Sequence, residues 1–423
     1  MIKNLPKEFD WKFYLDFYQD LRVAGLKTMD DAVQHYLKHG YQEERKINSF
    51  HEYRESTVNC PPEPKILTFY LPAFYPFLEN NQFWGEGFTE WTNIRSWKPF
   101  YPGHQIKQSS LEFGQYDLRD LAVRKKHGEL AKTSGIHGFV FYHYWFSTHP
   151  AKKVMHEVLE KMLEDGEPNV PFCLEWANEP WTKKWDGYEH EYLIKQEYGS
   201  IEDQRMHFDY LNKFFSHPNY IKVDEKPMFC IYRIGHISDF EKLKSNFNQF
   251  AIEAGYPGIH FVELLNSFND ANGKFNIHAD AYAEYHPMYI NWIGGFNETS
   301  VSTSRIGVIN IEDKWKKITE IEPDPAKIQN KEYYRGMYAG WDASPRALNR
   351  HCVHDAFGDP AKFQKYLTLQ LNRVKKDSFN PNNYLFLFAW NEWGEGAVLE
   401  PSDLTGSSYL EAVLDSLNDV KNK

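Results

Sequence analysis

Eight short apolar runs are spaced along residues 65–392, and amphipathic, helix-like stretches separate several of them. The runs are Lys65–Pro72, Gly138–Trp145, Pro171–Trp176, Pro227–Arg233, Ile259–Leu264, Ala281–Tyr285, Gly336–Trp341 and Tyr384–Glu392. Continuous apolar strands that alternate with helices are typical of a parallel sheet covered on both faces. Eight such strands predict an α/β fold of the (β/α)8 TIM-barrel type, with a doubly wound open sheet as the alternative.

The beginning of the chain has a different pattern. Apolar residues recur at helical spacing in "FDWKFYLDFYQDLRVAG", and "MDDAVQHYLKHG" predicts a second helix that Asp30 or Asp31 caps. The proline-rich stretch "CPPEPK", Cys60–Lys65, predicts a linker. We therefore expect a small helical accessory module and linker at residues 1–60 and the barrel at residues 61–423.

The charge and the cysteines exclude several classes of protein. A formal net charge of −11 argues against a nucleic-acid partner, which would require a basic surface. The four cysteines contain no CxxC pair, so we expect neither a disulfide framework nor a zinc site. The stretch "HCVH", His351–His354, is too weak a metal signal to predict a site.

The sequence also bears on location. The first residues, "MIKNLPKEFDW", lack the apolar core of a signal peptide, and no apolar run is long enough to cross a bilayer. We therefore expect a cytoplasmic protein without a transmembrane segment.

Polar and aromatic residues collect where the predicted strands end. The active site of a (β/α)8 barrel lies at the carboxyl ends of its strands. The substrate-binding candidates at these ends are Tyr70, His143, Trp145, Glu175, Asn178, Glu179, Glu284, His286, Trp341 and Asp342. Each is equally compatible with a structural ion pair or a satisfied core group, and only their recurrence at strand ends favours a site. Glu179 lies in "NEP", which leaves a catalytic role as its alternative.

The last apolar run carries the strongest signal, because "YLFLFAWNEWGEG" ends in two glutamates. Glu392 and Glu395 are three residues apart, and the two glycines of the motif allow the chain to curl and bring both carboxylates to one side. Paired carboxylates are the groups that glycoside chemistry requires. We expect Trp390 and Trp393 to desolvate the acid and to raise its pKa. The alternative is a glutamate pair that binds backbone amides at the barrel mouth.

Aromatic residues make up 17% of the chain, and several lie in the loop "FWGEGFTEWTNIRSWKPFYPGH" after the first run. Sugar rings have apolar faces that stack on aromatic side chains, so this composition favours a glycan ligand over a merely aromatic core. We predict that the loop folds over the barrel mouth and binds sugar through Trp84, Glu86, Glu90 and Trp91. A lid packed only for stability is the alternative.

Together these motifs resemble a known family. The stretch "FAWNEWGEGAVLEP" is similar to the "FNEWHEGxxxE" motif of family 99 glycoside hydrolases, the endo-α-mannosidases, and "YAGWDASPR" resembles their "GPGYDDTxIR" segment. The resemblance is closer to the WbsX-type, family 99-like proteins of bacterial O-antigen, lipopolysaccharide and capsule biosynthesis. Those proteins share "FYLPxFHPxxENxxWWGxGFTEW" and "HYWF", which appear here as "FYLPAFYPFLENNQFWGEGFTEW" and "FYHYWF". The resemblance covers about residues 64–410.

The resemblance implies a mechanism. The glutamate that matches Glu392 assists the attack of the substrate's 2-hydroxyl on the anomeric carbon, and the one that matches Glu395 is the general acid and then the base. Configuration is retained without a metal or an organic cofactor. Asn391, Trp393 and Arg346 match motif positions and are expected to bind substrate. Gly394 stands where the hydrolases have histidine, so the mannoside specificity is not carried over, and the acceptor is either water or a sugar hydroxyl.

The first segment has a resemblance of its own, to short helical modules that accompany bacterial surface-polysaccharide enzymes. The matching residues are Phe9, Asp10, Phe13, Tyr14, Leu15, His35, Tyr36, His39, Gly40, Glu43 and Arg45. We expect an accessory module without chemistry of its own that docks another protein or a glycan.

Three functions remain open. The first is retaining cleavage or transglycosylation of a bacterial surface polysaccharide or its precursors by Glu392 and Glu395. The second is a nucleotide-sugar-dependent glycosyltransferase, although the sequence contains neither an Asp-x-Asp motif nor a G-x-G-x-x-G loop. The third is a non-catalytic glycan-binding scaffold.

Overall fold

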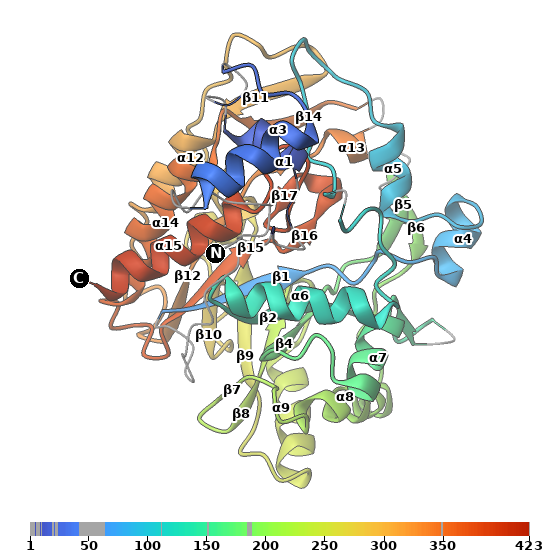
Figure 1. Cartoon of the computed structure of the whole chain (residues 1–423). Helices are drawn as coiled ribbons and strands as arrows, with labels where there is room; N and C mark the ends of the chain where they lie inside the picture. The colour runs from blue at the N-terminus through green and yellow to red at the C-terminus, as the bar shows by residue number, and fades with distance from the viewer. Residues whose placement is uncertain are drawn as a thin grey trace.

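The computed structural model describes residues 5, 9, 11–18, 21, 24–41, 64–110, 112–149, 152–183, 188–347 and 350–422. A closed barrel of eight parallel strands forms its centre (Figure 1). The strands are β1 (Lys65–Tyr70), β2 (Ile136–Trp145), β4 (Phe172–Trp176), β8 (Lys226–Ile231), β9 (His260–Leu265), β10 (Ala281–Glu284), β12 (Glu332–Tyr338) and β15 (Tyr384–Phe388). Each strand pairs with the next in this order, and β15 pairs with β1 to close the circle. The predicted (β/α)8 barrel is confirmed, and the alternative prediction of a doubly wound sheet is wrong.

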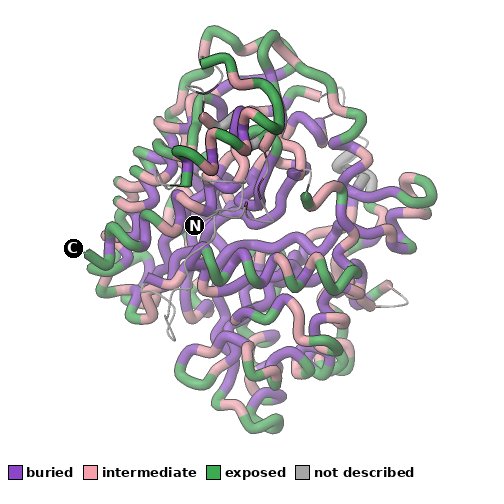
Figure 2. The backbone as a smooth tube through the Cα atoms, in the orientation of Figure 1, coloured by how far each residue is buried: buried purple, intermediate pink, exposed green. Residues whose placement is uncertain are grey.

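Helices cover the outside of the barrel. They are α6 (Leu121–Thr133), α7 (Glu157–Asp165), α8 (Ile201–Phe215), α9 (Phe240–Glu253), α10 (Phe268–Ala271), α11 (Met288–Ile293), α12 (Ile311–Ile318), α14 (Pro360–Val374) and α15 (Ser408–Lys421). The barrel strands are buried almost throughout, as their purple colour in Figure 2 shows. One face of each strand points into the barrel and the other packs under helices, which explains why the strands are continuous apolar runs in the sequence.

Additional short elements follow β1, β12 and β15, which are neighbours in the barrel. These elements are α4 (Leu78–Trp84), α5 (Glu90–Ser96), β13 (Trp341–Asp342), α13 (Ser344–Ala347), β16 (Asn391–Glu392), the 3₁₀ turn η4 (Trp393–Glu395) and β17 (Ala397–Val398). Helices α5 and α13 contact each other and both contact η4 (Figure 1). Segments almost 300 positions apart in the sequence therefore meet above one sector of the barrel.

Smaller strands and turns lie in the remaining connections. They are β3 (Lys153–Val154), β5 (Trp181–Lys183), β6 (Tyr188–Ile194), β7 (Lys222–Val223), β11 (Ile306–Asn310), β14 (Cys352–Ala356) and the 3₁₀ turn η3 (Ile234–His236). Strands β11, β14 and β13 form a separate three-stranded sheet. In the described part of the chain, no helix is both long enough and apolar enough to cross a membrane. The cytoplasmic location stays a prediction.

The N-terminal segment contains α1 (Trp11–Phe17), α3 (Met29–His35) and the π-helical turn η1 (Tyr36–Gly40). Its buried residues form a small core of their own, made by Tyr14, Leu15, Leu21, Ala32 and Tyr36. The predicted cap of the second helix is wrong, because Thr28 is the N-cap and Asp31 completes a capping box with it. Most of the predicted linker lies outside the described residues, as do Asp10, Glu43 and Arg45, so the boundary after residue 60 stays a prediction.

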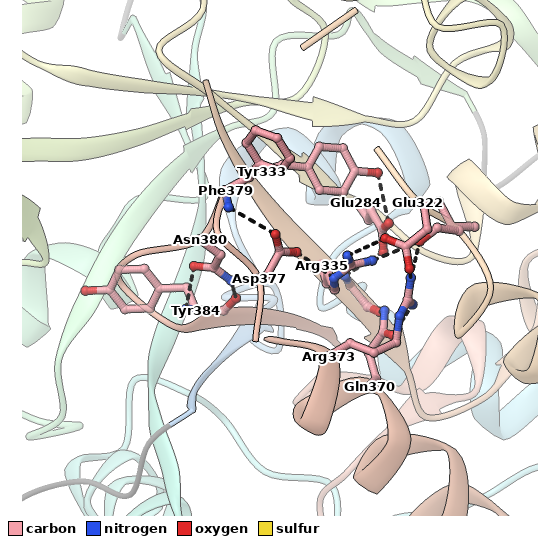
Figure 3. Close-up of polar contacts among 12 residues, drawn as sticks. Glu284, Glu322, Tyr333, Arg335, Gln370, Arg373, Asp377, Phe379, Asn380 and Tyr384 are labelled. Carbon is pink, nitrogen blue, oxygen red and sulfur yellow. Dashed lines mark hydrogen bonds and ion pairs between the residues drawn. The ribbon is translucent and has the colours of Figure 1, made fainter. Parts of the chain in front are cut away.

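A buried polar network connects the outer side of β12 to α14 (Figure 3). Arg335 donates from Nε to Asp377 Oδ2 (2.7 Å) and from Nη2 to Glu322 Oε2 (2.8 Å). Arg373 of α14 also donates to Glu322, at 2.8 Å. The side chains of Arg335 and Asp377 are 5% and 3% exposed, whereas that of Glu322 is 69% exposed. The Arg335–Asp377 pair is thus the buried part of the network.

We predict that Arg335→Met destabilises the protein by about 3 kcal/mol, because it leaves the charge of Asp377 buried without its guanidinium. Glu322→Gln is the matched control and should cost less than about 1 kcal/mol, since an exposed ion pair contributes little. The free energy of unfolding, measured in urea, checks both values. Equal losses for the two variants would contradict the assignment of the buried pair.

Candidate active site

Tyrosine side chains fill the interior of the barrel below its mouth. Tyr285, directly after β10, packs its ring on Phe69 of β1 with 4.9 Å between ring centroids, and its hydroxyl lies 2.8 Å from that of Tyr142 in β2. Because successive side chains of a strand point to opposite faces, Tyr144 faces the same way as Tyr142. Glu175 of β4 belongs to this group, since its charge acts on both Tyr142 and Tyr285.

Glu392 and Glu395 are delivered by a short excursion beyond β15. The strand ends at Phe388, and Asn391–Glu392 then pairs with Ala397–Val398 as a small hairpin, β16 with β17. Between them, η4 turns the chain, and Gly396 closes the turn with φ +66°. A left-handed φ of this kind favours glycine. The turn brings the carboxylates of Glu392 and Glu395 to the same side, as the spacing of the motif predicts.

The guanidinium of Arg346, from α13, joins three carboxylates. Its Nη2 donates to Glu90 Oε1 (2.9 Å) and to Glu392 Oε2 (3.1 Å), and its Nη1 donates to Glu395 Oε1. Burial disfavours the charge of the guanidinium, but the carboxylates of Glu395, Glu90 and Glu392 more than offset it and raise the pKa of Arg346. These four side chains are a single electrostatic unit, which we call the arginine cluster.

The arginine cluster holds more negative groups than positive ones. Burial, together with the neighbouring charge of Glu395, raises the pKa of Glu392 to about 8, although Arg346 opposes the shift. Tyr142 contributes a hydrogen bond to Glu392. Burial also raises the pKa of Glu90. Glu392 therefore retains its proton at neutral pH.

Glu175 lies beside the arginine cluster without a partner of its own. It is fully buried, and neither of its carboxyl oxygens accepts a hydrogen bond from the described residues. Burial, and then the charge of Glu392, raises the pKa of Glu175 well above its ordinary value. A buried carboxyl group is normally hydrogen-bonded. Its two oxygens are thus available to a ligand that brings hydroxyl groups.

Asp342 positions the helix that carries Arg346. Its Oδ1 accepts from the Ser344 backbone N–H at 2.9 Å, at the start of α13, and its Oδ2 lies 2.8 Å from His104 Nε2. Burial opposes ionisation of Asp342, but the hydrogen bond to His104 and the nearby His354 hold its pKa below the ordinary value. Asp342 was predicted to bind substrate, and its structural partners instead make it a support for α13.

His104, Asp342 and His354 also lie close enough together to be considered as metal ligands. The two imidazole rings, however, stack at 4.7 Å with an angle of 25° between their planes. A ligating nitrogen directs its lone pair in the plane of its ring, so stacked rings cannot both point at one ion. The Phe100 N–H also donates to His104 Nδ1 (3.3 Å), which leaves the proton on the Nε2 that faces Asp342. The group is therefore a hydrogen-bonded cluster.

Three predicted site residues face outward from their strands. Tyr70 bonds His127 of α6, with 2.8 Å between its hydroxyl and Nδ1. His143 lies 2.9 Å from His207 of α8, and Trp145 stacks on the same His207 at 4.7 Å. Burial lowers the pKa of His143 to about 3, so the histidine pair is neutral. Alternation therefore places these side chains under the helices and outside the arginine cluster, and substrate binding by them stays a prediction.

Glu284 and His286 are also outside the barrel interior, on either side of the inward-facing Tyr285. Glu284 accepts from the Tyr333 hydroxyl (2.8 Å) and from the Gly336 N–H (2.8 Å), and it lies 3.2 Å from His286. Figure 3 shows Glu284 and Tyr333 beside the Arg335 network. Both residues have structural partners and lie outside the arginine cluster, and substrate binding by them stays a prediction.

The two predicted asparagines tie loops together. The amide of Asn391 accepts from the Leu71 N–H (2.7 Å) and donates to the Leu71 C=O (2.9 Å), which joins the ends of β15 and β1. Asn178 makes the equivalent pair with the backbone of Arg233, at 2.8 Å and 2.9 Å. Both side chains are fully buried and bind backbone groups, so their role in this structure is to join loops, and substrate binding by them stays a prediction.

The tryptophans of the two motifs are mostly structural. Trp393 donates to Glu400 Oε2 (2.7 Å), and Trp91 donates to the Tyr116 carbonyl (2.8 Å). Trp390 packs on His127, on the outer side of the barrel. None of the three is more than 3% exposed. The structure thus gives these tryptophans structural partners. That Trp91 and Trp393 bind sugar, and that Trp390 and Trp393 desolvate the acid, stay predictions.

The other predicted residues lie around the mouth. Trp341 is almost buried and contacts Phe388 of β15. Glu179 is half-buried and pairs with Arg233 Nε at 3.0 Å. Trp84, the last residue of α4, is half-buried, and Glu86 is exposed in the loop between α4 and α5. Of this loop, the structure brings only Glu90 into the arginine cluster.

Sequence reasoning missed the interior tyrosines, Tyr142, Tyr144, Tyr232 and Tyr285. The signal was present, since Tyr142 and Tyr144 alternate with His143 and Trp145 in one strand. The residue types alone favoured the histidine and the tryptophan. Only the packing of Tyr285 on Phe69 establishes which face of the strands is the interior.

Known proteins are similar to this chain in sequence and in fold. The profile of the family described as Glycosyltransferase WbsX matches residues 66–413. The protein WxcX from two strains of Xanthomonas campestris pv. campestris, B100 and ATCC 33913, is 28% identical over 371 and 358 residues, which cover 86% and 83% of this chain. The chain spans about half the length of these curated relatives, 51% and 49%.

Solved structures share the fold. The family 99 endo-alpha-mannosidase of Bacteroides thetaiotaomicron, in complex with BIS-TRIS-propane, is 15% identical, with a TM-score of 0.52 over 85% of this chain and 98% of that one. A glycoside hydrolase-like protein is 14% identical, with a TM-score of 0.55 over 85% and 95% of the two chains. The chain has the barrel fold of the family 99 glycoside hydrolases. Since the family profile covers most of the chain, the chain belongs to the WbsX glycosyltransferase family, a carbohydrate-active group.

Proposed function

We propose that the protein is a carbohydrate-active enzyme that cleaves or transfers a glycosidic bond with retention of configuration. Its substrate is a bacterial surface polysaccharide or a precursor of one, and a mannoside-like sugar is one candidate, because the mannosidase named above shares the fold. Glu392 assists the 2-hydroxyl, and Glu395 is the general acid and base. The N-terminal segment docks a partner protein or the glycan itself.

The observation that carries the proposal is the convergence of carboxyl groups at the barrel mouth. Glu392 and Glu395 share one guanidinium, and beside them the carboxyl oxygens of Glu175 accept no hydrogen bond from the described residues. A sugar brings many hydroxyl donors, which suit such acceptors. Paired carboxyl groups are also the usual catalytic machinery for glycosidic bonds.

In the proposed reaction, entry of the sugar moves the retained proton from Glu392 to Glu395. The Glu392 carboxylate then takes the proton of the 2-hydroxyl while that oxygen attacks the anomeric carbon. The bond from this carbon to the leaving oxygen breaks, and Glu395 gives its proton to that oxygen. The 1,2-anhydro sugar is then opened at the anomeric carbon by a water or sugar hydroxyl, whose proton passes to Glu395. Glu392 returns its proton to the 2-oxygen. Two inversions at one carbon give retention.

Transfer from a nucleotide sugar is the second candidate, since the family is described as a glycosyltransferase. The charges at the site disfavour it. Three carboxyl groups, those of Glu90, Glu392 and Glu395, contact the guanidinium of Arg346, and the carboxyl group of Glu175 lies beside that of Glu392. A diphosphate is bound best by clustered arginines, lysines or helix N-termini. Saturable binding of a UDP- or GDP-sugar would favour this candidate instead.

The principal test is turnover. We expect the wild-type protein to shorten or lengthen surface polysaccharide of its source strain, as seen in new reducing ends or in altered chain length. Glu395→Gln should lower the rate at least about 100-fold, because it removes the general acid. Glu241→Gln on α9, whose side chain is 74% exposed, is the control and should retain the wild-type rate.

Two results would speak against the proposal. Unchanged turnover in Glu395→Gln would exclude its catalytic role. Tight glycan binding without turnover across a broad panel of polysaccharides would favour the non-catalytic scaffold.

The protonation of Glu392 gives a prediction that needs no substrate. A carboxyl group whose pKa rises from 4.5 in the unfolded chain to about 8 in the folded one stabilises the protein most below pH 4.5 and loses that contribution as the pH rises to 8. Glu392→Gln cannot ionise, so its melting temperature should fall less than that of the wild type between pH 5 and pH 8. Parallel profiles of the two proteins would contradict the raised pKa.

A further inference from the structure

Gly394, in the turn between Glu392 and Glu395, lies where any side chain would meet two charged groups. A Cβ atom built on Gly394 would lie 2.5 Å from Glu90 Oε2 and 2.9 Å from Arg346 Nε. Its φ is not in the left-handed region, unlike that of Gly396, so the backbone does not require glycine here. The lack of space does require glycine, because the Glu90 carboxylate and the Arg346 guanidinium cannot both remain in place beside a methyl group.

Glu90 occupies that space from the other end of the chain. It is the first residue of α5, in the loop after β1, and it is only 3% exposed. Its Oε1 accepts from Arg346, while its Oε2 accepts no hydrogen bond from the described residues. A buried carboxylate that shares its guanidinium partner with two other carboxylates lowers the stability of the fold, which argues for a role beyond packing.

We propose that Glu90 is a positioning residue of the catalytic centre, which holds Arg346 between Glu392 and Glu395, and that Gly394 is its structural counterpart. The catalytic nature of this centre rests on the function proposed above, whereas the close approach of Glu90 to Gly394 does not. The sequence resemblance gives the family 99 hydrolases a histidine at the position of Gly394. A histidine in this chain at position 394 would take the space of Glu90.

The geometry indicates what Glu90 does. Arg346 Nη2 is divided between Glu90 and Glu392, and Nη1 binds Glu395. Without Glu90, Nη2 is left to Glu392 alone and stabilises its charged form. The charge of Glu90 also acts directly on Glu392 and raises its pKa. Both effects have the same sign, so Glu90 keeps the proton on Glu392 before a ligand enters.

The pairing is tested with a double-mutant cycle of Gly394→Ala, Glu90→Ala and the double variant. Gly394→Ala should lower the melting temperature by about 3 °C in the wild-type background. In the Glu90→Ala background the same change should cost less than half as much, because the closest atom has been removed and Arg346 can shift. Equal losses in the two backgrounds would overturn the pairing.

Gly235→Ala is the matched control for this cycle. A Cβ on Gly235 meets nothing within 4 Å, and its φ is not positive, so the change should cost the same with or without Glu90. A Gly235→Ala loss that depended on Glu90 would show that Glu90→Ala disturbs the whole fold and would invalidate the cycle as support.

The positioning role is tested with Glu90→Gln, which keeps the shape and removes the charge. Infrared titration follows the protonated carboxyl band of Glu392, identified by its loss in Glu392→Gln. We expect a midpoint near pH 8 in the wild type, lowered by about one unit in Glu90→Gln. Glu241→Gln removes a remote charge and should leave the midpoint in place.

An unchanged midpoint in folded Glu90→Gln would reduce Glu90 to a packing residue and overturn the role. Neither measurement requires a glycan. Failure to find turnover would therefore count against the proposed function while leaving the inference about Glu90 intact. An unchanged midpoint would overturn the inference about Glu90 and leave the proposed function intact.

Discussion

The guanidinium of Arg346 is the group on which the arrangement of the candidate site depends. It is the only cation in contact with Glu90, Glu392 and Glu395 among the described residues, and these carboxylates follow β1 and β15, while Arg346 itself follows β12. Those three strands are neighbours in the closed barrel. A cluster built from positions so far apart in the chain can therefore exist only once the barrel has closed.

The surroundings of Arg346 restrict its freedom to move. Asp342 accepts a hydrogen bond from the backbone at the start of the short helix α13, and His104 is hydrogen-bonded to Asp342. The turn that carries Glu395 packs closely on the same segment, since a Cβ on Gly340 would lie 3.0 Å from the Gly396 carbonyl oxygen. These buried contacts involve backbone atoms as well as side chains, which makes the support rigid. Such pre-organisation is what a catalytic centre requires of the groups around it.

The excess of carboxyl groups is a property of the whole centre. In a buried site, like charges cannot all be present, so protons are retained, and we expect the entry of a ligand to change the protonation of the centre. Glu392 and Glu175, whose pKa values burial raises, are the groups most sensitive to such a change. A ligand rich in hydroxyl groups fits this environment better than an anionic one.

Periodicity in the sequence determined the architecture of the protein. The eight apolar runs became the eight barrel strands, because a strand buried on both faces must be apolar at nearly every position. The motif around Glu392 and Glu395 also predicted that the two carboxylates meet, because the local turn geometry depends mainly on neighbouring residues.

Only the tertiary structure decided which strand-end residues face the interior. Tyr70, His143, Glu284 and Trp393 have the residue types of a sugar site, yet alternation and burial place them under helices or in the core. Their orientation depends on strand register and on which face closes inward, and no single run of sequence contains that information. The contact of Glu90 with Arg346 likewise joins residues 256 positions apart, so only the closed barrel could disclose it.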